Sequence, residues 1–85
     1  MNEFERVIRA FMAERGVGTL RELHAQLMAA GHVVDYDRLR RHLTGAGTKR
    51  GRDPRLNRAL AEVLGLTGEE RVRLALANLP GLIVR

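Results

Sequence analysis

Apolar residues at the start of the chain recur every three or four positions, which is the spacing of one face of an α-helix. In the stretch 3–14 they are Phe4, Val7, Ile8, Phe11 and Met12. This period predicts an amphipathic helix whose apolar face lies in a core. Acidic residues in the first turn and the Arg15-Gly16 ending fit the charge and capping preferences of such a helix.

Two later helices are predicted from their capping signals. Thr19-Leu20-Arg21-Glu22 and Thr67-Gly68-Glu69-Glu70 both have the form of a capping box, in which two side chains satisfy two backbone amides at a helix start. The first of these helices should end at Gly31 and the second at Pro80-Gly81, because such residues stop or break helices. Asp53-Pro54 starts a further helix, which is predicted to end at Gly65.

The same spacing predicts which residues of these helices are buried. In the helix after Thr19 they are Leu20, Leu23 and Leu27, with Met28 and Ala30 beside them. In the helix after Asp53 they are Leu56, Ala59, Leu60, Val63 and Leu64. In the last helix they are Val72, Ala75, Leu76 and Leu79, with Leu74 off this stripe.

The stretch 34–45 predicts a helix of a different kind. Asp35 stands at the N-cap, where its side chain is expected to accept an amide hydrogen from Asp37 or Arg38. Gly45 stands at the stop. The large apolar residues within the helix are few and four positions apart, at Leu39 and Leu43. Because so narrow a stripe can bury only one side, most of this helix should face solvent or a partner.

No strand pattern of useful length appears, so the 85 residues predict an all-α domain of five helices over 1–79 and a short apolar tail, 80–85. The chain has no cysteine and no serine, which removes thiolate metal sites and two common nucleophiles. We therefore expect neither an enzyme nor a cofactor. The first 15 residues mix acids and bases, and no stretch suits a membrane span, so we expect a cytoplasmic protein.

Basic residues are concentrated in one quarter of the chain. Residues 38–58 carry eight bases and one acid, a net charge of +7, whereas the remaining 64 residues carry a net charge of −2. The bases are Arg38, Arg40, Arg41, Lys49, Arg50, Arg52, Arg55 and Arg58. Such an asymmetry favours a polyanion as the partner, and nucleic acid is the simplest one.

The order of these elements predicts a helix-turn-helix. One helix ends at Gly31, a tight apolar turn follows, and a short basic helix comes next. Val33 and Val34 are expected to be buried between the two helices and to fix the angle between them. This arrangement suits double-stranded DNA because a short helix fits the major groove with its first residues at the base edges.

The chain is similar to the lambda-repressor/Cro-like (XRE-type) helix-turn-helix family, from about Phe4 to Leu79. The pieces that carry this resemblance are Glu14-Arg15-Gly16, Thr19-x-x-Glu22-Leu23, Val34-Asp35, Leu39-Arg40-Arg41-His42-Leu43-Thr44-Gly45, Asp53-Pro54 and Leu60-Ala61-Glu62-Val63-Leu64-Gly65-Leu66-Thr67-x-Glu69-Glu70. The resemblance implies a compact five-helix DNA-binding domain. Two departures stand out: Leu20 occupies a position where the family usually has glutamine, and the turn between Leu27 and Asp35 is longer than usual.

The resemblance implies a division of roles around the third helix. The candidates for base contacts are Tyr36, Asp37, Arg38 and Arg40, because arginine pairs with guanine O6 and N7 and a carboxylate accepts from cytosine N4. Asp37 is equally a solvent residue favoured by the helix dipole, and Tyr36 equally a residue that packs across the turn or bonds a phosphate. The candidates for phosphate contacts, which position the protein, are Arg41, Thr44, Lys49, Arg50, Arg52 and Arg55.

The sequence thus predicts a sequence-specific, repressor-like transcriptional regulator that binds double-stranded DNA. A homodimer through the last helix and the tail is expected, since the family reads two half-sites about 34 Å apart. A protein-interaction module, such as an antitoxin or adaptor, and a non-specific nucleic-acid binder remain the alternatives. His24, His32 and His42 do not share a helix face with further ligands, so we expect surface or boundary histidines and no metal site.

Overall fold

The computed structural model describes residues 2–45 and 53–78. Over these ranges the chain forms five α-helices and no strand, which confirms the all-α prediction. The helices are α1 (Glu3–Glu14), α2 (Leu20–Ala29), α3 (Tyr36–Thr44), α4 (Pro54–Leu64) and α5 (Gly68–Asn78). The radius of gyration is 12.1 Å, close to the value of about 12 Å expected for a compact chain of this length.

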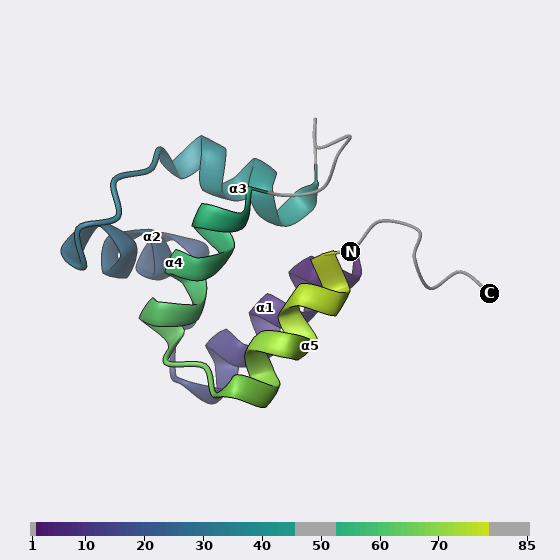
Figure 1. Ribbon diagram of the computed structural model, residues 1–85. Coiled ribbons are helices and arrows are strands. Elements are labelled where there is room, and N and C mark those ends of the chain that lie inside the picture. Colours follow the sequence, from purple (N-terminus) through teal and green to yellow (C-terminus); the bar gives the residue numbers. More distant parts are fainter. Residues whose placement is uncertain (1, 46–52, 79–85) are drawn as a thin grey trace.

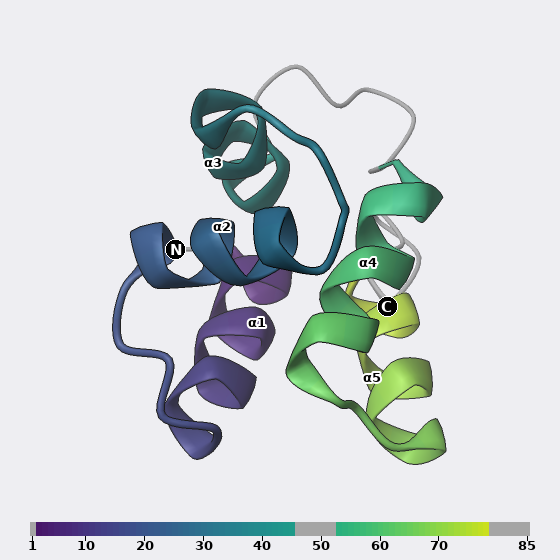
Figure 2. The same cartoon turned by 90° about the vertical axis from the view of Figure 1, so that its left-hand side faces the viewer.

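The helices pack around α1 and α2 (Figure 1). Helix α1 contacts α3 and α5, while α2 contacts α3 and α4. Helix α3 lies at the top edge of the molecule both in Figure 1 and in the perpendicular view of Figure 2. Its upper side therefore faces away from the other four helices.

The predicted capping boxes are both present. The Glu22 amide donates to Thr19 Oγ1 at 3.1 Å, and the Thr19 amide donates to Glu22 Oε1 at 3.3 Å. At α5 the Glu70 amide donates to Thr67 Oγ1 at 3.2 Å, and the Thr67 amide donates to Glu70 Oε1 at 2.9 Å. Asp53 caps α4 by accepting from the Arg55 amide at 2.9 Å. Caps of this kind each stabilise a helix by about 1 kcal/mol.

Helix α3 begins and ends where the sequence predicts, but its first cap differs. Asp35 is the N-cap residue, yet its side chain makes no capping hydrogen bond, so that part of the prediction is wrong. The start of α3 is held instead by contacts from α2 and α4, described below. Gly45 ends the helix with φ +82°, and its amide donates to the Arg41 carbonyl at 2.8 Å. Any other residue would be strained in this left-handed conformation.

The core is built from the apolar faces of all five helices. Its completely buried large side chains are Phe4, Ile8, Met12, Leu23, Leu27, Leu39, Leu43 and Leu60. The predicted apolar residues of α1 are all buried, and so are Leu20, Leu23 and Leu27 of α2. In α4 the predicted stripe is confirmed except that Val63 is half-buried, and Ala61 is buried as well.

Helix α5 is rotated relative to the prediction. Leu74, expected off the stripe, is 3% exposed, whereas Val72 and Leu76 are 60% and 52% exposed, and Ala75 is exposed too. The buried stripe of this helix was therefore predicted wrongly. Its apolar residues fall on two opposite sides, so helical spacing alone does not choose between them. Leu79, also predicted as buried, lies outside the described residues.

Arg15 contacts the side of α5 that faces the core. Arg15, just after α1, donates to Glu70 at 2.7 Å and also to the Leu64 carbonyl at the end of α4. Glu70 and Leu74 are four positions apart and share a helix face, so this contact and the buried Leu74 lie on the same side of α5. The Thr67 amide lowers the pKa of Glu70 from its ordinary value, and Arg15 lowers it further against the opposing effect of burial.

The end of α2 and the following turn are more open than the sequence suggests. Met28 is 42% exposed and Ala30 is exposed, so neither belongs to the buried face. Val33 is 84% exposed, so the prediction that it is buried is wrong. Of these two valines only Val34, which is half-buried, packs against the core. Helix α2 ends at Ala29, and Gly31 follows it in the left-handed conformation with φ +90°.

Candidate nucleic-acid interface

Helix α3 has one buried and one charged side. Leu39 and Leu43 are buried as predicted, and His42 joins them at 6% exposure. Arg38, Arg40 and Arg41 are exposed, with side-chain exposures of 62%, 53% and 58%. The arginines therefore lie on the part of α3 that is not used for packing.

His42 fixes α3 against α1 and α4. Its Nε2 lies 2.6 Å from Asn57 Oδ1 of α4, and an imidazole N–H donates well to such an amide oxygen. Its ring meets the Phe4 ring of α1 edge-on, with centroids 5.4 Å apart at 83°. A surface or boundary position was predicted for His42, and that prediction is wrong. The i, i+3, i+4 spacing of Leu39, His42 and Leu43 was the signal that places it on the buried stripe.

Asn2 joins the start of α1 to the end of α3. Its Oδ1 accepts the Glu5 amide at 2.8 Å and caps α1. Its Nδ2 donates to the Leu43 and Thr44 carbonyls at 3.0 and 2.9 Å. One side chain thus caps the N-terminus of one helix and the C-terminus of another. The sequence offered no signal for this contact because 41 residues separate Asn2 from Leu43.

The long turn before α3 is held by His24 of α2. Its Nε2 lies 2.6 Å from the Val34 carbonyl, just before the N-cap of α3. The His24 ring meets the Tyr36 ring edge-on at 5.8 Å and 87°, and the Arg21 guanidinium lies over Tyr36 at 4.7 Å. Tyr36 is therefore half-buried and packs across the turn, which is one of the three roles left open for it.

Two further contacts tie this region to α4. His32 Nε2 lies 3.0 Å from Glu62 Oε1, and Arg38 Nη2 donates to Asp53 Oδ2 at 2.9 Å. Together with His24 they join the turn and the first turn of α3 to the helices on either side. These contacts therefore support the angle of α3 despite the extra length of the turn.

Asp37 lies between two arginines on the exposed side of α3. Arg40 Nη2 donates to its Oδ1 at 2.7 Å, and Arg41 Nε lies 3.0 Å from its Oδ2. The hydrogen bond from Arg40 lowers the pKa of Asp37 the most, and the charge of Arg41 lowers it further. All three side chains are more than half exposed, and ion pairs in such positions add little to stability. Both guanidiniums can therefore exchange Asp37 for a phosphate or a base at little cost.

The candidates for phosphate contacts lie partly within the described residues. Arg41 and Thr44 are exposed near the end of α3, and Thr44 Oγ1 donates to the Arg41 carbonyl at 3.3 Å. Arg55 is exposed at the start of α4. Lys49, Arg50 and Arg52, predicted as phosphate contacts on a basic loop, lie outside the described residues.

Within residues 2–45 and 53–78, no group of three or more histidine, cysteine or acidic side chains is arranged to hold a metal ion. None of the helices in this part of the chain has the length and apolar character needed to cross a membrane. Comparison of the chain with protein-family models, with curated proteins and with solved structures finds no match.

Proposed function

We propose that this protein is a sequence-specific DNA-binding regulator of the lambda-repressor-like helix-turn-helix type, with α2 and α3 as its two motif helices. The observation that carries the proposal is the two-sided character of α3. It anchors Leu39, His42 and Leu43 in the core and presents three exposed arginines at one edge of the molecule. A short helix mounted in this way suits the DNA major groove, which is about 12 Å wide.

In this proposal Arg38 and Arg40 make the base contacts. Arg38 lies in the first turn of α3, the part of a recognition helix that meets base edges. Its guanidinium would exchange the Asp53 carboxylate for guanine O6 and N7. Asp37 would either accept from cytosine N4 or continue to orient Arg40 and Arg41. Tyr36 supports the start of α3 through its packing, and direct base contact stays a prediction for it.

Arg41, Thr44 and Arg55 would hold phosphates on either side of the groove, together with Lys49, Arg50 and Arg52. Phosphate contacts provide affinity but no sequence information. A single copy offers few such contacts, so two copies on two half-sites would bind more tightly. The spacing of such half-sites is about one helical turn of DNA, roughly 34 Å.

Selection of bound fragments from a random DNA pool tests this function. We expect an enriched sequence that binds at least about 10³-fold more tightly than random DNA. Its log K should fall linearly with log salt, with a slope of about −0.9 per neutralised phosphate. Salt-dependent binding without an enriched sequence would identify a non-specific nucleic-acid binder. No binding to DNA would leave the protein-interaction module as the remaining candidate.

A further inference from the structure

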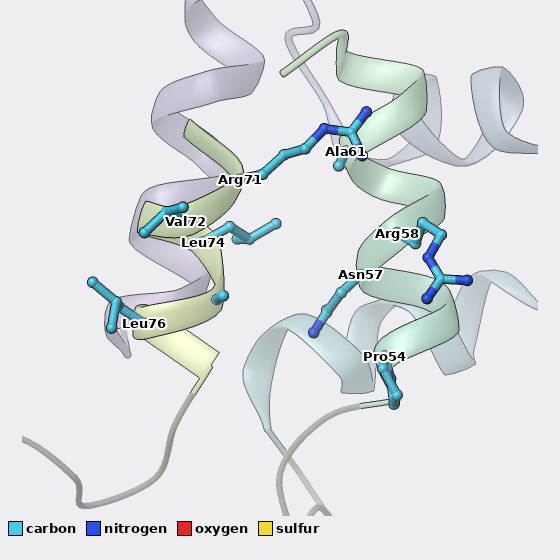
Figure 3. A pocket seen from close by; sticks show the side chains of 9 residues that line it. Pro54, Asn57, Arg58, Ala61, Arg71, Val72, Leu74 and Leu76 are labelled. Carbon is cyan, nitrogen blue, oxygen red and sulfur yellow. The ribbon is translucent and has the colours of Figure 1, made fainter. Parts of the chain in front are cut away.

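Helices α4 and α5 leave an apolar groove between them (Figure 3). Its volume is about 480 Å³, and α4 and α5 both contribute side chains to it. The lining residues are Pro54, Asn57, Arg58, Ala61, Arg71, Val72, Leu74, Ala75 and Leu76. The groove forms because each of these helices packs elsewhere, α4 against α2 and α5 against α1.

One wall of the groove is exposed apolar surface. Val72 and Leu76 are 60% and 52% exposed, which makes them two of the four exposed large apolar residues of the described chain. They lie one helical turn apart on the same side of α5. Arg71 reaches from α5 toward Ala61 at one end of the groove, whereas Pro54 and Leu76 lie toward the other end, where α5 finishes (Figure 3). An apolar segment that follows α5 would therefore meet the groove at its near end.

We propose that the C-terminal segment 79–85 of the same chain folds back and lies in this groove. In the sequence Leu79-Pro80-Gly81-Leu82, proline is followed by glycine, the order that the two central positions of a chain-reversing type II turn prefer. Leu82-Ile83-Val84 follows at once, and it is the only place in the sequence where three large apolar residues are consecutive. A segment with these properties fits an apolar groove beside the helix that precedes it.

The length of this segment matches the groove. From Asn78, at the end of α5, Leu76 and Val72 lie about 3 and 9 Å back along the helix axis. Three extended residues after the turn cover about 10 Å. Residues 82–85 can therefore run back along α5 as far as Val72. If this segment fills the groove, a second copy of the chain has to bind at another face. The inference concerns only this segment and the groove, so it does not depend on DNA binding.

Engineered cysteines test the position of the segment in the full chain, which has no cysteine of its own. Ala75→Cys with Val84→Cys places one thiol in the groove and one in the segment. The matched control, Arg73→Cys with Val84→Cys, has a similar separation along the chain, but Arg73 does not line the groove. We expect the Ala75 pair to form its intramolecular disulfide on the order of tenfold faster, because docking raises the effective concentration of the thiols.

Equal rates for the two pairs would overturn the proposal, because an undocked segment reaches both faces of α5 alike. Disulfides that form mainly between chains would overturn it in favour of a second copy in the groove. Thermal unfolding gives a second measurement in the full chain. Leu82→Asp should lower Tm by on the order of 4–8 °C, whereas Val33→Asp, at an apolar residue already 84% exposed, should leave it almost unchanged. Equal Tm changes for the two variants would also overturn the proposal.

Discussion

Replacing Arg38 with alanine separates base recognition from folding. Arg38 and its partner Asp53 have side-chain exposures of 62% and 34%, so their ion pair stabilises the fold by at most about 1 kcal/mol. For a domain of this size 1 kcal/mol corresponds to about 4–8 °C in Tm, and the variant should melt no further below the wild type than this. Loss of a guanine contact should cost about 1–3 kcal/mol on the selected DNA sequence. This cost corresponds to an increase in Kd of about 5- to 160-fold.

Arg41→Ala is the matched control for this prediction. Arg41 lies on the same helix, has a side-chain exposure of 58% and also pairs with one carboxylate, that of Asp37. As a phosphate contact it should affect selected and random DNA alike and reduce the salt slope by about one. Fluorescence anisotropy with both DNAs at several salt concentrations measures these effects. If Arg38→Ala weakened both DNAs by the same factor, the proposed position of α3 in the groove would be wrong.

Variants at three further positions test the contacts that hold α3 and α5. His24→Ala removes the Nε2 contact with the Val34 carbonyl, and we expect a stability loss of about 1 kcal/mol in urea unfolding; an unchanged midpoint would contradict a role in holding the turn. Asn57→Leu removes the acceptor for buried His42 and should cost about 1–3 kcal/mol, whereas Asn57→Asp, which keeps an acceptor, should cost less. The pKa of Glu70 is lowered from 4.5, so its ionised form stabilises the fold above about pH 4.5, and this contribution is lost as the pH falls through the lowered value. The urea midpoint of the wild type should therefore drop more steeply below pH 5 than that of Glu70→Gln, and parallel curves would exclude this contribution.

Local signals in the sequence determined the helices themselves. Each capping box needs only two side chains three positions apart, and both formed as predicted. Gly45 and Gly65 end α3 and α4 because a left-handed residue is needed there and glycine adopts it without strain. The exposed side of α3 was also predictable. Leu39 and Leu43, four positions apart, define the buried side of this helix, and the arginines occupy the other positions.

The tertiary structure decided what depends on contacts between distant residues. The buried side of α5 carries the pairing of Glu70 with Arg15, which are 55 residues apart. The support of α3 follows from Asn2, His24 and Asn57, polar residues whose roles depend on what lies opposite them. The spacing of apolar residues predicts which residues of one helix share a side. Where a helix has two apolar sides, as α5 has, the spacing does not predict which of them packs against the core. For this reason the sequence determined the five helices and the basic side of α3, whereas the tertiary structure decided that α5 turns Leu74, and not Val72 and Leu76, toward the core.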